Sequence, residues 1–286
     1  MPATTRLIDD PPPPPARAAS VAQVCYSHAV LTVRGVVLEV VERGQGRPIL
    51  WLHGEEGLDP QAPFLDLLAG AGRVTAPSHP GFGHSPESST VDTVDDLAYL
   101  YLDLLAEQDR RDVIVIGASL GGWIAAEMAV RSTERIAGLV LVGALGIKVG
   151  DRETRDIPDI FALHPDEVVR LQYRDPARFV VDYTKKSDDE LAIIARNREA
   201  TALYAWEPYF HNPKLPQRLH RVTVPTLFLW GADDRFISAE YYGAAYRAAI
   251  PGSRLELVER AGHFPHLEQP EAVVERIRGF VRDRGT

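Results

Sequence analysis

The stretch Gly117-Ala118-Ser119-Leu120-Gly121-Gly122 decides the fold of this chain. An apolar run at residues 113–116 precedes it and another at residues 123–130 follows it, which predicts a buried strand, a sharp turn and a buried helix. Glycine on both sides of Ser119 suits a turn so tight that it lifts the serine hydroxyl above the edge of the sheet. We therefore interpret Ser119 as a nucleophile presented at a strained strand-to-helix turn.

Strands and helices alternate along most of the chain. Apolar or alternating runs predict strands at residues 29–33, 36–41, 48–52, 113–116, 139–142, 226–230 and 255–258. A capping box at Thr93-Val94-Asp95-Asp96 opens a helix that runs to about Glu107, and a last helix opens at Pro270 and closes near Val281. This alternation indicates an α/β fold with a doubly wound parallel sheet and helices on both faces.

Two segments depart from the alternation. Residues 1–22 include five consecutive prolines among small and charged residues, which predicts a disordered arm. Residues 145–215 hold no strand-like run, but Asp175-Pro176 and the capping box at residues 187–190 predict helices there. So long a segment is a helical insertion, either a lid or a structural addition. The core then comprises residues 23–144 and 216–286.

Composition excludes several classes of function. The chain has 286 residues and a net charge of −9, and no run of Lys or Arg exceeds a pair, which disfavours nucleic acid and anionic membranes as partners. The single cysteine, Cys25, cannot form an internal disulfide. The chain begins without an apolar signal core and holds no apolar run long enough to span a bilayer. We expect a cytoplasmic protein, with its oligomeric state left open.

A nucleophilic serine needs a base and an acid, and both should follow strands, because open parallel sheets place ligands at the carboxyl ends of their strands. Asp234 follows the strand predicted at residues 226–230, and His263 follows the strand predicted at residues 255–258. The chain order serine, acid, histidine suits this arrangement. We expect His263 to deprotonate Ser119 and Asp234 to orient the imidazole; Asp233 is the alternative acid.

Attack of a serine on an ester also requires two donors for the oxyanion. We expect one to be the backbone N–H of Leu120 and the other to be the backbone N–H of Glu55, where Gly54 lets the chain turn close to the site. The side chains of Glu55 and Glu56 are expected to point to solvent. If either faced the pocket, it would disfavour anionic substrates through repulsion of like charges.

Other residues have weaker claims to function. Four aromatic residues are candidates for an apolar substrate pocket, although each also suits the protein core: Trp123, Trp206, Tyr209 and Phe264. His263 and His266 flank a proline and lack a cysteine or acid at ligand spacing, so no metal site is expected. Three further histidines fall in separate loops and are interpreted as structural: His53, His79 and His84.

Together these motifs resemble the α/β-hydrolase superfamily, from about residue 28 to the end of the chain. The motifs are His53-Gly54, the segment at residues 77–85, the turn at residues 117–122, Gly231-Ala232-Asp233-Asp234 and Gly262-His263. The resemblance implies a mostly parallel eight-stranded sheet, with residues 145–215 as a helical cap that lines the pocket. It also favours Asp234, the fourth residue of a Gly-x-x-Asp turn, as the acid, and the N–H of Glu55 as an oxyanion donor.

Within that superfamily, Ser119 excludes the branches with an aspartate nucleophile, the haloalkane dehalogenases and epoxide hydrolases. Ala118 and Phe264 replace the Asn and Trp common in carbon-carbon bond hydrolases, and Leu120 replaces the Trp usual in proline iminopeptidases. We therefore expect a serine hydrolase without a cofactor that cleaves a carboxylic ester, lactone or thioester of a small apolar molecule through an acyl-serine. The alternatives are carbon-carbon hydrolysis of a vinylogous diketone from ring cleavage, or a ligand-binding protein without turnover.

Overall fold

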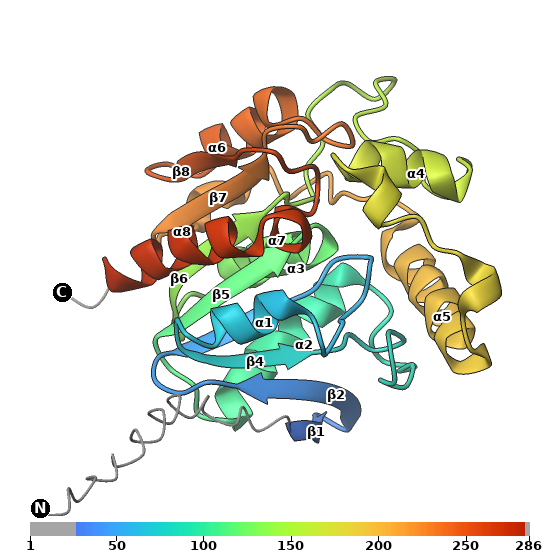
Figure 1. Cartoon of the computed structure of the whole chain (residues 1–286). Helices are drawn as coiled ribbons and strands as arrows, with labels where there is room; N and C mark the ends of the chain where they lie inside the picture. Colours follow the sequence, from blue (N-terminus) through green and yellow to red (C-terminus); the bar gives the residue numbers. More distant parts are fainter. Residues whose placement is uncertain (1–26, 284–286) are drawn as a thin grey trace, which may run out of the picture.

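The computed structural model describes residues 27–283, so the arm predicted at residues 1–22 and Cys25 lie outside it. A twisted sheet with helices on both faces forms its centre (Figure 1). The strands are β1 (Ser27–Val33), β2 (Val36–Arg43), β3 (Pro48–Leu52), β4 (Arg73–Pro77), β5 (Val113–Ala118), β6 (Ile136–Val142), β7 (Thr226–Gly231) and β8 (Arg254–Val258). Their order is β1-β2-β4-β3-β5-β6-β7-β8.

The pairing within this sheet is mostly parallel. Strand β2 pairs antiparallel with β1 and with β4, whereas all strands from β4 to β8 in the spatial order run parallel. The predicted eight-stranded, doubly wound, mostly parallel sheet is therefore confirmed. Strand β4 has no counterpart among the strands predicted from the sequence, because its short run contains Thr75 and ends at Pro77, a residue rare inside strands.

Eight α-helices are found within residues 27–283. They are α1 (Pro63–Leu68), α2 (Val94–Glu107), α3 (Leu120–Arg131), α4 (Pro165–Gln172), α5 (Asp188–Ala205), α6 (Ala244–Ala249), α7 (Pro265–Glu268) and α8 (Pro270–Arg282). Short 3-10 helices cover Pro176–Arg178, Tyr183–Lys185 and Leu219–Arg221, and a π-helix covers Ala239–Gly243. None of these helices is both long enough and apolar enough to cross a bilayer.

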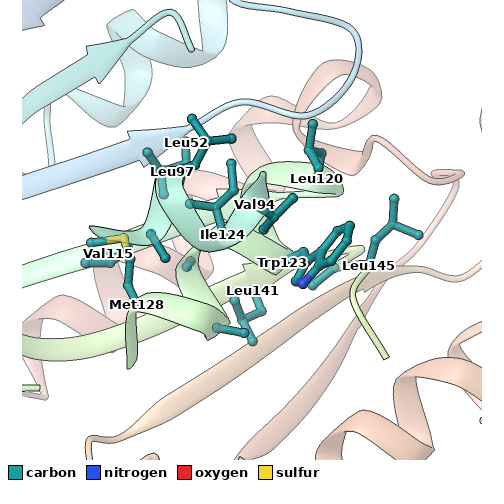
Figure 2. Packing of buried hydrophobic residues seen from close by; sticks show 14 of the residues in the cluster. Leu52, Val94, Leu97, Val115, Leu120, Trp123, Ile124, Met128, Leu141 and Leu145 are labelled. Carbon is teal, nitrogen blue, oxygen red and sulfur yellow. The ribbon is translucent and has the colours of Figure 1, made fainter. Parts of the chain in front are cut away.

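The two faces of the sheet bury separate apolar cores, because successive side chains of a strand point to opposite faces. Val115 of β5 packs beneath α2 and α3, whereas Ile114 and Ile116 pack with α1 and α8. Figure 2 shows the first of these cores, where Leu52, Val115 and Leu141 from three strands lie against the helices. Strand β5 is buried throughout, so the turn that follows it starts from a rigid centre.

Residues 145–215 leave the sheet and carry α4 and α5, which Figure 1 shows together to one side of the sheet. Helix α5 begins with the predicted capping box: Ser187 accepts from the N–H of Glu190, and the Glu190 carboxylate accepts from the N–H of Ser187. The start predicted at Asp175 produces only a turn of 3-10 helix. Helix α4 instead begins at Pro165, a position that the sequence signals did not mark.

Candidate active site

Ser119 occupies the turn between β5 and α3 with a strained backbone, φ 47° and ψ −113°. A non-glycine residue in such a region costs about 1–3 kcal/mol and persists only when its surroundings impose it. Here the surroundings are the two flanking glycines. A Cβ on Gly117 would overlap the carbonyl of Gly121, and a Cβ on Gly121 would overlap the carbonyl of Leu52. Glycine at both positions therefore lets β5 and α3 approach closely enough to form the turn.

Three of the predicted site residues meet at this turn. His263 Nε2 lies 2.8 Å from Ser119 Oγ, and His263 Nδ1 lies 3.0 Å from Asp234 Oδ2. The other carboxylate oxygen of Asp234 accepts from two backbone N–H groups, of Phe236 and Ile237, at 2.9 and 3.0 Å. A carboxylate, an imidazole and a hydroxyl in this order can activate the serine oxygen for attack on a carbonyl carbon.

Asp233, the alternative acid, points away from the imidazole. Its side chain is 43% exposed and forms a 2.8 Å ion pair with Arg174. The side chain of Asp234 is instead fully buried, because its two accepted N–H bonds and His263 hold it inside. Of the two neighbouring carboxylates, only Asp234 contacts His263 in the described residues.

The electrostatic surroundings of His263 favour its charged form. Burial acts to lower the pKa of His263, but the charge and hydrogen bond of Asp234, with further contributions from Glu55 and Glu56, outweigh it and raise the pKa above its ordinary value. The imidazole must be neutral to accept the serine proton. The base is therefore fully available only at a pH above its raised pKa.

Two residues that sequence reasoning did not single out fix the loop of His263. The buried carboxylate of Glu268 accepts from the N–H groups of Gly262, Arg174 and Asp175. The backbone N–H of His263 donates to the carbonyl of Gln172 at 2.6 Å. Both contacts join the histidine loop to the segment around α4. The contacts with Gln172, Arg174 and Asp175 could not be predicted locally, because these residues lie about 90 positions from the histidine loop.

The side chain of Glu55 does not point to solvent, so that expectation is wrong. Its Oε2 lies 2.6 Å from Ser119 Oγ, and its Oε1 accepts from Gln172 Nε2 at 2.8 Å. The side chain of Glu56 also turns inward, where it accepts from the N–H of Gly54 at 3.2 Å and lies 3.4 Å from His266 Nε2. Donors from distant segments hold the Glu55 carboxyl inside, whereas Glu56 is held by its own loop and by His266.

The two predicted oxyanion donors come from the start of α3 and from the loop that follows β3. Leu120 is the first residue of α3, where backbone N–H groups have no partner within the helix. The backbone N–H of Glu55 belongs to the same residue as the carboxyl that lies 2.6 Å from Ser119 Oγ.

His53 and His79 form hydrogen bonds to each other's backbone and to the loop that carries Glu55. His53 Nδ1 donates to the carbonyl of Gly54 at 2.7 Å, and His53 Nε2 accepts from the N–H of His79 at 3.0 Å. His79 Nε2 in turn donates to the carbonyl of His53 at 3.0 Å. A ring that donates at one nitrogen and accepts at the other is neutral. Burial lowers the pKa of His53 to about 4.

The lowered pKa of His53 predicts that the folded protein loses stability in acid. Unfolded His53 takes up a proton near its ordinary pKa of 6.5, whereas the folded residue resists protonation down to about pH 4. The stabilisation is therefore complete above pH 6.5 and declines as the pH falls towards 4, by about 3 kcal/mol in the free energy of unfolding. Urea unfolding at a series of pH values from about 7.5 down to about 4.5 measures how the free energy of unfolding changes with pH.

The variant His53→Asn retains a donor near the Gly54 carbonyl and removes the titrating ring, so its unfolding free energy should depend less steeply on pH. His84→Asn is the matched control, because His84 is exposed. An unchanged slope in His53→Asn would contradict the assignment of this pH dependence to His53.

A cavity of about 270 Å³ adjoins the Glu55 carboxyl and the segment around α4. Its apolar lining consists of Ile160, Phe161, Pro165, Val168, Val169, Tyr173, Val181, Tyr183, Ile194 and Phe264. Glu55 and Gln172 also line it, whereas Ser119 is fully buried and does not. The carboxyl of Glu55 thus reaches from the cavity to the serine oxygen.

Of the four predicted pocket aromatics, only Phe264 lines this cavity. Trp123 is buried in the core and its ring N–H lies 3.2 Å from the carboxylate of Glu127. Trp206 is 54% exposed and lines a separate surface groove together with Tyr209. The direction of each ring follows from packing between distant segments, which helical spacing alone does not reveal.

Comparisons with known proteins agree with this architecture. Residues 49–276 match the profile of the Alpha/beta hydrolase family. The chain is 28% identical to a 2-hydroxy-6-oxononadienedioate/2-hydroxy-6-oxononatrienedioate hydrolase of Cupriavidus pinatubonensis, over 81% of each protein. It is 27% identical to a pimeloyl-acyl-carrier-protein methyl ester esterase of Photobacterium profundum, over 84% of this chain and 96% of that protein. The solved bromoperoxidase of Bacillus anthracis superposes with a TM-score of 0.72 at 22% identity, covering 90% of this chain and 100% of that one.

Proposed function

Because the chain belongs to the alpha/beta hydrolase family, we propose that it is a serine hydrolase that cleaves a carboxylic ester, lactone or thioester. The observation that carries the proposal is the continuous set of hydrogen bonds from Asp234 through His263 to Ser119, at 3.0 and 2.8 Å. Each of the three groups follows the carboxyl end of a strand, the edge at which such sheets act on their ligands.

In the proposed reaction, His263 Nε2 takes the proton of Ser119 as Oγ attacks the carbonyl carbon. Asp234 keeps the proton of the imidazole on Nδ1 and stabilises the cation that forms. The N–H groups of Leu120 and Glu55 stabilise the oxyanion. The tetrahedral intermediate then collapses, and His263 protonates the departing alcohol or thiol. Water attacks the acyl-Ser119 with His263 as base, and the release of the acid restores the serine.

We propose a small, uncharged and mainly apolar substrate. Support comes from the apolar lining of the cavity and from Glu56, whose carboxylate also lines the cavity and would repel an anionic group there. Arg198 also lines the cavity, but its guanidinium lies over the ring of Phe161. On this proposal the insertion at residues 145–215 acts as a cap, since α4 supplies Gln172 and much of the lining.

Carbon-carbon hydrolysis of a ring-cleavage product is the second candidate, and the relative named for a dienedioate substrate favours it. Ala118 and Phe264 stand where such enzymes commonly have Asn and Trp. A dioate substrate would also bring negative charge towards the carboxylate of Glu56, which lines the cavity. These features favour esters over such anions. A ligand-binding protein without turnover remains the third candidate.

A fluorophosphonate probe and a substrate panel test the proposal together. We expect the probe to label Ser119, located by peptide mass spectrometry, and the protein to hydrolyse short-chain p-nitrophenyl esters faster than a 2-hydroxy-6-oxo-dienoate under the same conditions. Preferred cleavage of the dienoate would establish the second candidate. Folded protein that neither reacts with the probe nor cleaves any member of the panel would support the third.

A further inference from the structure

Ser119 Oγ has two close polar neighbours and only one hydrogen. Glu55 Oε2 lies 2.6 Å from it on one side, and His263 Nε2 lies 2.8 Å from it on the other. Both neighbours are acceptors when unprotonated, and the serine can donate to only one of them. Two hydrogen bonds at these distances therefore require a second proton, carried by the carboxyl or by the imidazole.

From this geometry we propose that Glu55 is a further catalytic residue, which shares one proton with His263 across Ser119 in the free enzyme. In one arrangement the serine donates to the Glu55 carboxylate and the imidazolium donates to the serine. In the other, the protonated carboxyl of Glu55 donates to the serine, which donates to neutral His263. Both hold the same number of protons, and only the second has the neutral base that attack requires.

The groups around this network support the shared proton. Asp234 and Glu56 are the other carboxylates whose charge acts on His263, and both favour the imidazolium. Burial favours the neutral form of Glu55, the charge of His263 opposes it, and the charge of Glu56 favours it. The net effect is a raised pKa of Glu55. The charges of Glu55 and Glu56 also help burial to raise the pKa of the nearby Tyr173 hydroxyl. His266 contacts Glu56 rather than Glu55.

The position of the carboxyl also couples proton transfer to substrate entry. Ser119 is fully buried, and the adjoining cavity is lined by Glu55 and Gln172 but not by Ser119. A substrate carbonyl must reach Ser119 Oγ, beside which the carboxyl of Glu55 now lies. Entry therefore displaces this carboxyl from the serine. If Glu55 departs in its neutral form, it leaves His263 neutral and ready to accept the serine proton.

The variant Glu55→Gln tests the shared proton, since it removes the charge and keeps the size of the side chain. Removal of a carboxylate this close should lower the pKa of His263 by about one to two pH units. The ring nitrogens of 15N-labelled histidine report that pKa by NMR in the free enzyme, without turnover. The acid limb of kcat/KM on a neutral p-nitrophenyl ester should move by the same amount, because kcat/KM reports the free enzyme.

Glu56→Gln is the matched control, because it removes the same charge from a carboxylate that contacts Gly54 and His266 and not the serine. The change in the pKa of His263 should be clearly smaller in this variant than in Glu55→Gln. A His263 pKa that changes equally in both variants, or in neither, overturns the proposal. Glu55→Ala repeats the test if the glutamine variant does not fold. The kinetic arm rests on the proposed function, whereas the NMR arm does not, so a failure of one is distinguishable from a failure of the other.

Discussion

Ser119→Ala is expected to lower kcat for p-nitrophenyl ester hydrolysis by about 10,000-fold or more. The reason is that Oγ is the atom that would form the acyl bond, and it lies 2.8 Å from His263 Nε2 and 2.6 Å from Glu55 Oε2. No other serine in the described residues contacts His263 through its hydroxyl. Only the stabilisation provided by the oxyanion donors and by substrate binding would remain. Initial rates at matched protein concentration measure the loss.

The same variant should remain folded. Alanine keeps the Cβ, and the Ser119 side chain makes no capping hydrogen bond to α3. We expect a thermal unfolding midpoint within a few degrees of the parent protein, about the effect of 1 kcal/mol. Turnover that survives in a folded Ser119→Ala protein would exclude the acyl-serine mechanism.

Asp234→Asn is expected to lower kcat by about 10,000-fold, an effect of the wrong imidazole tautomer. The amide oxygen can still accept from Phe236 and Ile237, which leaves the amide NH₂ facing His263 Nδ1. Nδ1 then becomes the acceptor and the ring proton moves to Nε2. His263 can no longer accept the proton of Ser119, while the position of the ring is preserved.

Asp233→Asn supplies the matched control, since it makes the same chemical change at the neighbouring position. Asp233 forms an ion pair with Arg174 in which both side chains are nearly half exposed, and such pairs contribute about 0–1 kcal/mol. Its kcat should stay within about twofold of the parent value, which is less than 1 kcal/mol in the barrier. Equal losses in the two variants would contradict the assignment of Asp234 as the acid.

Much of the fold could be predicted because its signals are local. The capping boxes at Thr93 and Ser187 lie at the starts of α2 and α5, and the apolar run before Ser119 forms the buried strand β5. Strand β4 and helix α4 escaped prediction, since β4 is a short run with a terminal proline and α4 spans only 8 residues and buries only Gln172. Their structure depends on pairing and packing with segments distant in the chain.

The sequence by itself determined the turn at Ser119 and the strand ends at which Asp234 and His263 stand, because glycine spacing and apolar runs constrain the backbone locally. The tertiary structure alone decided where side chains point. Glu55 turns inward because Ser119 and Gln172, which are 64 and 117 positions away in the chain, bring a hydroxyl and an amide to its carboxyl. A carboxylate inside a protein takes the orientation in which its hydrogen-bond donors lie. Only the folded chain brings donors from such distant positions together.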